Sequence, residues 1–382
     1  MKSDYLILGA GASGMMLAYR MAKDPFFDSK SIVIIDKDKK KGNDRTWCFW
    51  EKESDEWDSI ITKKWNDIFF GANGKMRKIP LHPYSYKMIR SGAFFEKLSN
   101  YILSKDNFSF HQDEVTNINT NQNNVEVHGK NSTFQASKVF NSLPINDSYL
   151  KQSKFPVLKQ HFIGWFIETK EDHFEADAAT FMDFNIEQKG NTRFMYILPI
   201  SKKQALFEYT LFSQDLLDKK VYEKAIEKYL KEKNINDYII TEKEKGSIPM
   251  TVYPFASENK KNLLNIGGAG GWTKASTGYT FSNCSTKTKD LVDFLKKSDD
   301  LTTFGKKSKY QLYDLLFLDV LYKNNELGAE IFSSLFEKVE IQTILEFLDD
   351  NSSIIQDMKI IFSVPRGKFT IALLKRILGL VN

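Results

Sequence analysis

The feature that most constrains this chain is a glycine-rich turn between two apolar runs near its N-terminus. One apolar run leads into Gly9, Gly11 and Gly14, and a second ends at Asp36, 22 residues after Gly14. In a dinucleotide-binding turn the first glycine permits the tight bend, the second lets the backbone approach a pyrophosphate, and the third lets helix and strand pack closely. The pyrophosphate lies at the positive end of the following helix, and an acid after the second strand binds ribose hydroxyls. We therefore predict that these four residues bind a dinucleotide.

The remainder of the chain is too long and too apolar to belong to one nucleotide unit. It has 382 residues, of which 42% are hydrophobic and 14% aromatic, enough for a large core divided between two domains. The net charge of +5 is small and acids lie close to every basic cluster, so we expect no nucleic-acid partner. The two cysteines lie far apart and the five histidines show no ligand spacing, so we expect no metal and a reducing, cytoplasmic location.

The order of the predicted elements favours a particular layout. The nucleotide unit is followed by a helix at 86–104, a strand-rich middle, an amphipathic helix at 214–234 and a glycine-rich return to the first domain. This order is typical of FAD-binding two-domain flavoproteins. We predict an α/β (α+β) fold with a Rossmann-like FAD-binding domain, a strand-rich substrate domain and a helical C-terminal region. The predicted domains are residues 1–155 plus 246–300 for FAD, 156–245 for the substrate and 301–382 for the helices.

The glycine-rich return supplies further predicted cofactor contacts. Gly267, Gly268 and Gly271 fit a helix N-terminus aimed at the pyrimidine oxygens of a flavin, where partial positive charge stabilises a reduced, anionic flavin. Many such flavoproteins have Gly-Asp at this point, so Gly267-Gly268 makes a hydroxylase-type redox cycle less expected. Arg45 is predicted to pair with a phosphate or the flavin, and Trp47 either lies beside it or belongs to the core.

Six short motifs occur in a fixed order along nearly the whole chain. They are Asp44–Trp50, Gln160–Trp165, Met182–Asp183, Phe207–Thr210, Gly246–Pro249 and Gly271–Tyr279. Each motif is weak alone, but together and at these separations they resemble the lycopene cyclase family, specifically the bacterial lycopene β-cyclases.

The resemblance implies a reaction and its cofactors. It implies an isomerase (an intramolecular lyase) that closes the linear ends of lycopene into β-ionone rings without net redox change, giving β-carotene by way of γ-carotene. FAD would act in its reduced form, NAD(P)H would serve only as the electron source, and the substrates would be carotenoids. The alternatives are an FAD-dependent monooxygenase or reductase acting on an isoprenoid, and a flavin-bearing protein that binds a carotenoid unchanged.

Glu208 is the main candidate for acid catalysis. Ring closure needs a proton placed on a terminal alkene, and a carboxyl group kept protonated by desolvation suits that task. In a strand, Glu208 shares a face with Leu206, Thr210 and Phe212, which surrounds the carboxyl with apolar groups. The alternative is an ion pair across a hairpin with a lysine such as Lys202 or Lys203. The family resemblance, through Phe207, Glu208 and Thr210, favours catalysis.

Two other features have open interpretations. Asp183 is a second acid in an aromatic strand, and we expect it either to orient Glu208 or act as a second acid or base, or to be a hydrogen-bonded structural residue. The basic amphipathic segment 368–380 either lies on the inner face of a membrane, which would help to collect a hydrocarbon from lipid, or packs as a terminal core helix.

Overall fold

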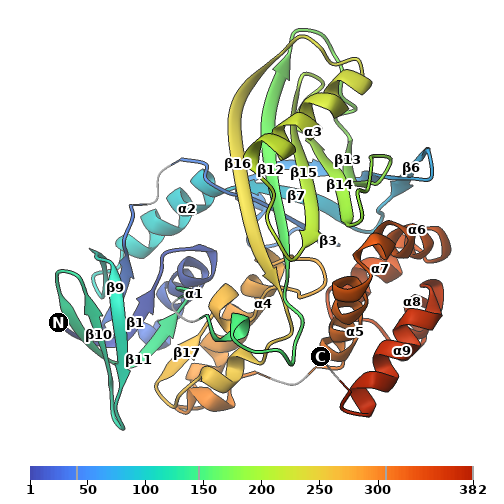
Figure 1. The fold of residues 1–382 in the computed structure, drawn as a ribbon. Helices are drawn as coiled ribbons and strands as arrows, with labels where there is room; N and C mark the ends of the chain where they lie inside the picture. The colour runs from blue at the N-terminus through green and yellow to red at the C-terminus, as the bar shows by residue number, and fades with distance from the viewer. Residues whose placement is uncertain (40–41, 145–146, 306–307, 381–382) are drawn as a thin grey trace.

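The computed structural model describes residues 1–39, 42–144, 147–305 and 308–380. Its first layer is a sheet in the order β8-β2-β1-β11-β10-β9, with β17 also paired to β11 (Figure 1). The central strands are parallel and apolar because helices cover them, as in nucleotide-binding folds. The strands are β1 (Lys2–Leu8), β2 (Ile32–Asp36), β8 (Phe108–Gln112), β9 (Val115–Thr120), β10 (Val125–Gly129), β11 (Thr133–Asn141) and β17 (Leu263–Asn265).

Three helices form the apolar layer beside this first sheet. Their buried residues, such as Met16, Phe94 and Leu291, belong to one core cluster together with Ile7 and Ile34 of the central strands. The helices are α1 (Ala12–Lys23), α2 (Ser91–Leu103) and α4 (Phe281–Leu295). This cluster holds the glycine-rich turn between β1 and α1 in a rigid setting.

The second sheet has the order β16-β12-β15-β14-β13-β5-β6, and α3 (Lys219–Glu232) packs on one of its faces (Figure 1). Its middle strands are rich in aromatic residues that are buried on both faces. The strands are β5 (Asp67–Ala72), β6 (Lys75–Pro80), β12 (Leu158–Thr169), β13 (Ala178–Asp183), β14 (Thr192–Pro199), β15 (Gln204–Ser213) and β16 (Tyr238–Met250).

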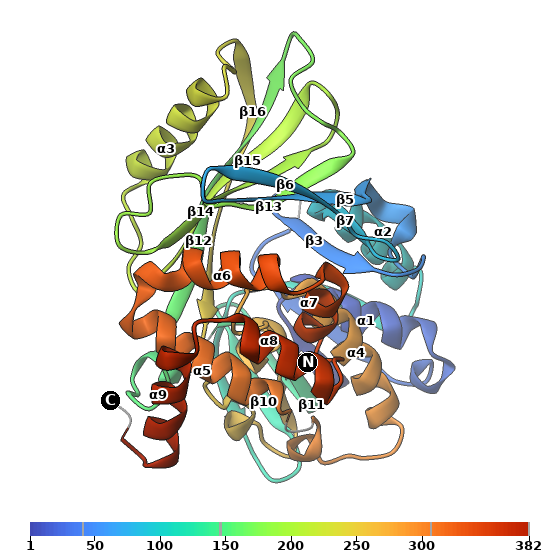
Figure 2. The same ribbon diagram turned by 90° about the vertical axis from the view of Figure 1, so that its right-hand side faces the viewer.

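A small third sheet, β3-β7-β4, crosses between the other two (Figure 2). It consists of β3 (Thr46–Glu51), β4 (Ile61–Trp65) and β7 (Ser85–Arg90). The predicted helix at 86–104 is therefore wrong over its first turn. Met88 and Ile89 fit either period, and antiparallel pairing of β7 with both β3 and β4 decides for the strand, so that α2 begins at Ser91.

The two-domain α/β architecture predicted from the sequence is confirmed by these sheets, but strands cross the expected domain boundaries. β5 and β6 come from within 1–155 and extend the second sheet, because β5 pairs in parallel with β13. β16 continues unbroken through residue 246. The assignment of residues 156–245 to a separate substrate domain stays a prediction.

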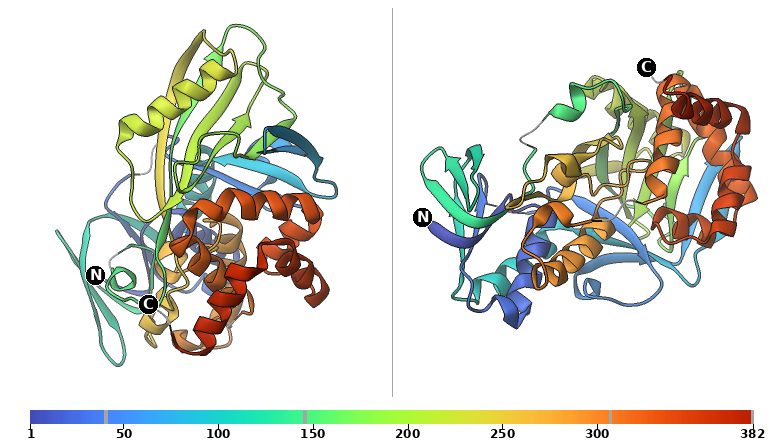
Figure 3. Two further views of the ribbon diagram at one scale, coloured as in Figure 1. Left: turned by 45° about the vertical axis from the view of Figure 1, so that its right-hand side comes forward. Right: turned by 90° about the horizontal axis from the view of Figure 1, so that it is seen from below.

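The C-terminal region is helical, as its periodicity predicts. Figures 1 and 3 show its helices gathered on one side of the molecule, away from the β9–β10 hairpin. Their buried side chains share a core cluster with the second and third sheets. The helices are α5 (Tyr310–Lys323), α6 (Gly328–Lys338), α7 (Ile341–Leu348), α8 (Ile354–Ser363) and α9 (Arg366–Ile377).

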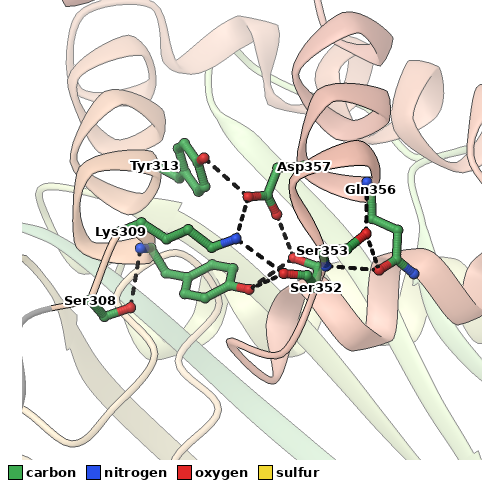
Figure 4. Close-up of polar contacts among 8 residues, drawn as sticks. Ser308, Lys309, Tyr313, Ser352, Ser353, Gln356 and Asp357 are labelled. Atoms are coloured by element: carbon green, nitrogen blue, oxygen red, sulfur yellow. Dashed lines mark hydrogen bonds and ion pairs between the residues drawn. The ribbon is translucent and has the colours of Figure 1, made fainter.

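A polar network fixes α8 against the start of α5 (Figure 4). The buried carboxylate of Asp357 accepts from Lys309 Nζ at 2.6 Å, from Tyr313 Oη at 3.2 Å and from Ser352 Oγ at 2.5 Å. Ser353 and Gln356 close a reciprocal capping box at the first turn of α8. The network determines which side of α8 faces the core and which side faces outward.

Candidate functional site

The first glycine-rich turn has the backbone geometry that a dinucleotide needs. Gly9 follows β1 with φ of +91°, a region that favours glycine. A Cβ at Gly14 would lie 2.1 Å from the carbonyl oxygen of Gly9, so only glycine lets α1 pack this close to the turn. A Cβ at Gly11, the N-cap of α1, would meet no atom within 4 Å. The open space at Gly11 lies at the positive end of α1, where a phosphate group fits.

Asp36 ends β2 beside this turn. Its carboxylate accepts hydrogen bonds from the backbone N–H of Ala10 at 2.7 Å and of Asp38 at 2.9 Å. The acid is therefore fixed at the carboxyl edge of the sheet, next to the glycine turn, in the place where a ribose-binding acid is predicted.

The glycine-rich return lies against the first turn rather than at the start of a long helix. A Cβ at Gly267 would lie 2.3 Å from Ser13 Oγ, at the beginning of α1, and a Cβ at Gly268 would meet no atom within 4 Å. Gly267–Gly270 is a short 3-10 turn, and Gly271 follows with φ of +66°. The expectation that these glycines begin a helix is wrong, because α4 starts only at Phe281. The two open glycines, Gly11 and Gly268, leave room for a dinucleotide at this edge.

Arg45 and Trp47 have different surroundings although they are neighbours in the chain. Arg45 is exposed, and its Nη1 donates to the carbonyl of Asp44 at 2.7 Å. Trp47 is half-buried and packs its ring 5.1 Å from that of Phe94 and 5.6 Å from that of Phe281, which favours the core interpretation of Trp47. The contact of Arg45 with a phosphate or a flavin stays a prediction.

Glu208 lies on β15, buried between two neighbouring strands. It is directly opposite Tyr196 of β14 and Gly164 of β12, and the residue is 7% exposed. The proposed pairing with a lysine across the hairpin is wrong. Lys202 pairs with Asp172, and Lys203 donates to the carbonyl of Lys170.

A second carboxylate, Glu244 of β16, belongs to this site although it was not predicted from the sequence. Gly164 pairs with Glu208 on one side and with Glu244 on the other, so all three positions share one face of the sheet. A Cβ at Gly164 would lie 2.8 Å from Glu208 Cγ and 3.1 Å from Glu244 Cγ. The missing side chain leaves the space in which both carboxyl groups lie. Strand alternation over 238–250 does not separate Glu244 from Glu242, the other acid on this strand, and the register with β12 is what places Glu244 beside Gly164.

The two carboxyl groups face each other in a buried setting. Burial, and then the charge and hydrogen bonding of Glu244, raise the pKa of Glu208 well above its usual range. Thr46 of β3 donates its hydroxyl to Glu244 Oε2 at 2.8 Å. The other oxygen, Glu244 Oε1, is buried and has no hydrogen-bond donor among the described residues.

Hydroxyl and thiol groups from β3, β7, β14 and the glycine-rich return complete this side of the site. Tyr86 Oη lies 2.6 Å from Tyr196 Oη and 3.2 Å from Tyr279 Oη. Burial raises the pKa of the Cys48 thiol to about 12 and that of all three tyrosines above their usual value. Since Tyr279 belongs to the glycine-rich return, the carboxyl pair lies where the second sheet meets that loop and β3.

Asp183 lies on the opposite face of the same sheet. It pairs with Met195, which pairs with Tyr209, the neighbour of Glu208, so the two acids point to opposite sides. Asp183 accepts from Tyr229 of α3 at 2.6 Å and from the backbone N–H of Asn185 at 2.9 Å. Asp183 therefore does not contact or orient Glu208, and its hydrogen bonds favour the structural interpretation, while a separate acid–base role for Asp183 stays a prediction.

An apolar cavity of about 350 Å³ lies among the C-terminal helices. Phe317, Phe332 and Phe347 contribute to its wall, together with Ser276 and Thr277 of the glycine-rich return. The same loop that carries Tyr279 therefore also borders a space suited to a hydrocarbon. No cluster of three or more histidine, cysteine or acidic side chains able to hold a metal occurs in the described ranges.

Comparisons with known proteins agree on both fold and family. The family model for lycopene cyclase protein matches residues 4–376. A lycopene beta-cyclase from Pantoea ananas is 23% identical over 287 residues, which cover 72% of this chain and 70% of that protein. A geranylgeranyl bacteriochlorophyll reductase-like protein from Thermoplasma acidophilum has a TM-score of 0.59 at 10% identity, covering 100% of this chain and 99% of that chain. The p-nitrophenol 4-monooxygenase PnpA from Pseudomonas putida has a TM-score of 0.61 at 10% identity, covering 96% and 98%.

The structural neighbours and the glycine turns together define the class as that of the two-domain flavoprotein fold. Within that class the chain belongs to the lycopene cyclase family, since the family model spans nearly its whole length. The resemblance seen in the six sequence motifs is thereby confirmed.

Proposed function

We propose that this protein is a lycopene β-cyclase, which converts the linear ends of lycopene into β-ionone rings without net redox change. The single observation that carries the proposal is the buried Glu208, whose raised pKa keeps it protonated beside a second carboxylate. A neutral carboxylic acid in an apolar strand setting is a suitable proton donor to an alkene. A monooxygenase or a reductase has no evident need for such a group.

FAD is the proposed cofactor. Gly9, Gly11 and Gly14, with Asp36, would hold its pyrophosphate and ribose, and Gly267 and Gly268 would border the same space. Reduced FAD supplies an electron-rich ring system that stabilises a nearby positive charge, with NAD(P)H as the source of electrons. Because the Cβ direction at Gly11 is open, Gly11→Val should fold yet yield flavin-free protein. Retention of stoichiometric flavin by this variant would contradict the assignment.

The remaining steps belong to the side chains. Glu208 gives its proton to the terminal alkene, and the ring closes onto the resulting cation. The surrounding buried aromatic residues, among them Tyr86 and Phe166, would exclude water that would otherwise trap the cation as an alcohol. Loss of a proton from the ring then gives the neutral product, so one proton enters and one leaves per ring.

A lipid surface is the proposed source of the substrate. The outward sides of α8 and α9 carry apolar residues with large exposed fractions, including Ile354 (75%), Ile355 (74%) and Ile377 (70%). Exposed basic residues, among them Lys359 and Lys375, lie on the same two helices and complement an anionic bilayer. The apolar cavity opens among these helices. In the described part of the chain no helix has both the length and the hydropathy to cross a bilayer.

Pigment analysis of lycopene-producing cells tests the reaction. Expression of the chain should convert lycopene to β-carotene with γ-carotene as the intermediate, and purified enzyme should consume far less than one NADPH per ring. A hydroxylated, epoxidised or hydrogenated product with one NADPH per turnover would favour the monooxygenase or reductase alternative. Unchanged lycopene bound to flavin-loaded protein would favour a binding protein.

Sedimentation with vesicles tests the membrane surface. The protein should bind vesicles that contain phosphatidylglycerol more strongly than pure phosphatidylcholine vesicles. The double variant Ile354→Ser/Ile355→Ser should lose binding, whereas Ile239→Ser, at another exposed isoleucine on β16, should not. Equal loss in both variants, or none, would remove α8 from the proposed surface.

A further inference from the structure

The carboxyl groups of Glu208 and Glu244 form a pair whose geometry calls for one proton. Both flank Gly164 on the same face of the sheet, and a Cβ there would crowd the Cγ atoms of both residues. Two carboxylates in contact within a buried site cannot both ionise without strong repulsion. A proton on one of them converts that repulsion into a hydrogen bond.

The hydrogen-bond donors around the pair indicate where this proton resides. Thr46 donates to Glu244 Oε2, which favours the negative charge on Glu244. The second oxygen, Glu244 Oε1, is buried and has no donor among the described residues. A protonated Glu208 would supply that donor, and leaving the atom unpaired would cost about 1–3 kcal/mol.

We propose that Glu208 and Glu244 share one proton and act as a carboxyl pair, which first donates that proton to the substrate alkene and then recovers a proton from the ring. This inference rests on the proposed cyclase function and adds Glu244, a residue not predicted from the sequence, as a positioning residue for the proton on Glu208.

The proton balance of the pair closes over one ring. Before the step the pair carries one proton and one negative charge. Transfer of that proton to the terminal alkene makes a new C–H bond and leaves two carboxylates beside a carbocation, which their charges stabilise. Ring closure consumes a second double bond, and loss of a ring proton to the pair forms the ring alkene and restores the starting state. No oxidant or reductant is consumed.

The other groups facing the pair are neutral or already paired. Cys48 of β3, Tyr196 of β14, Tyr86 of β7 and Tyr279 of the glycine-rich return keep their protons because burial raises the pKa of each. Farther along the same face, the Arg90 guanidinium lies 2.5 Å from the Glu242 carboxylate and 4.0 Å from the ring of Phe166. The pair is therefore the group on this face whose titration governs proton donation.

An infrared titration of the flavin-loaded protein tests the shared proton without reference to turnover. Wild-type protein should show a carboxylic-acid band that persists into the neutral range and is absent from Glu208→Gln. In Glu244→Gln the band should disappear about one to three pH units lower, because the neighbouring charge is gone.

Thr46→Val should also shift the band, whereas Thr46→Ser keeps the hydroxyl and should not. Asp183→Asn, on the opposite face, is the control that leaves the band unchanged. An unshifted midpoint in flavin-loaded Glu244→Gln overturns the proposal.

Activity profiles separate this proposal from the proposed function. Glu244→Gln should lose cyclisation at neutral pH by about 10- to 1000-fold, in proportion to the shift, and recover it when the pH is lowered. Glu208→Gln should not recover at any pH. If wild-type protein forms no ring product, the proposed cyclase function is wrong. The infrared titration still tests whether Glu208 and Glu244 share a proton. If wild-type protein forms the ring product and Glu244→Gln keeps the wild-type pH profile of cyclisation, the shared proton is wrong and the proposed cyclase function stands.

Discussion

The two faces of the second sheet each bury an acid, and the two acids have opposite surroundings. Asp183, on the face covered by α3, accepts from Tyr229 Oη and from the backbone N–H of Asn185. Glu208, on the face toward β3, meets a second carboxylate and hydroxyls that are already bonded to each other. Donors stabilise the charge of an acid, whereas an acceptor keeps its proton on. We therefore expect the first acid to stabilise the fold and the second to be available for chemistry.

A glycine lies beside each acid and extends this comparison. A Cβ at Gly71 would lie 2.2 Å from Asp183 Oδ1, and a Cβ at Gly164 would lie 2.8 Å from Glu208 Cγ. Both acids thus occupy the space of a missing side chain in a neighbouring strand. The same kind of substitution should consequently lower the stability of the protein on the face of Asp183 and its activity on the face of Glu208.

The largest difference is expected when each acid is replaced by its amide. Glu208→Gln should lower cyclisation by about two to four orders of magnitude, because an amide cannot protonate an alkene, and should keep flavin and fold. Asp183→Asn should retain the turnover rate of folded enzyme and lower the free energy of unfolding by about 1–3 kcal/mol, since an amide N–H₂ then faces a donor. Rates per bound flavin and urea unfolding measure the two effects. Near-normal ring formation by flavin-loaded Glu208→Gln would refute the assignment of Glu208.

The second comparison replaces the two glycines. Gly164→Ala pushes Glu208 and Glu244 away from their positions, and a displacement of about 1 Å costs roughly 100-fold in rate. Gly71→Ala crowds Asp183 and should cost about 1–3 kcal/mol of stability, with the rate per folded enzyme preserved. Both variants are assayed for flavin content, rate and unfolding midpoint. Equal rate losses in the two variants would show that the faces are mechanically coupled and would weaken the distinction.

Part of this site could be predicted from the sequence, and the reason is locality. The dinucleotide turn consists of residues close together in the chain, so Gly9, Gly11 and Gly14 are predictable from the sequence together with the strand and helix around them. Glu208 was found because strand alternation places it among apolar side chains. Glu244 was not, because its role depends on the register of β16 against β12, which brings together residues 80 apart in the chain. The sheet face on which Asp183 lies could not be predicted either, because the register between β13 and β14 shifts between Thr180 and Asp183.

A smaller effect is expected from the hydroxyl that holds Asp183. Tyr229→Phe removes the 2.6 Å bond to Asp183 Oδ2 and leaves a buried carboxylate with one donor fewer, at a cost of about 1–3 kcal/mol. Cyclisation and its pH profile should not change, because Tyr229 is on the α3 face. The matched variant Tyr196→Phe, on the face of Glu208, should alter the pH profile of cyclisation instead. A changed profile in Tyr229→Phe would mean that the α3 face influences the proton on Glu208.

The last expected effect is absent near neutral pH and concerns a titration on the α3 face. His161 is buried, with Nε2 2.6 Å from Ser213 Oγ and Nδ1 2.6 Å from Tyr222 Oη, and burial lowers its pKa to about 4. The unfolded chain binds a proton to this histidine at a higher pH than the folded protein does. Stability is therefore fully present above about pH 6.5 and falls as the pH decreases toward 4, by about 2 kcal/mol at pH 5.

Urea unfolding of wild-type protein and His161→Asn at pH 7.5 and pH 5 isolates this contribution. The difference in unfolding free energy between the two proteins should shrink at pH 5, because the asparagine does not titrate. The α3 face would then lose stability as the pH falls, whereas the face of Glu208 loses its proton, and with it cyclisation, as the pH rises. If His161→Asn shows the same pH dependence of stability as wild type, other groups cause the acid sensitivity. Only the expected loss of cyclisation at high pH would then distinguish the two faces.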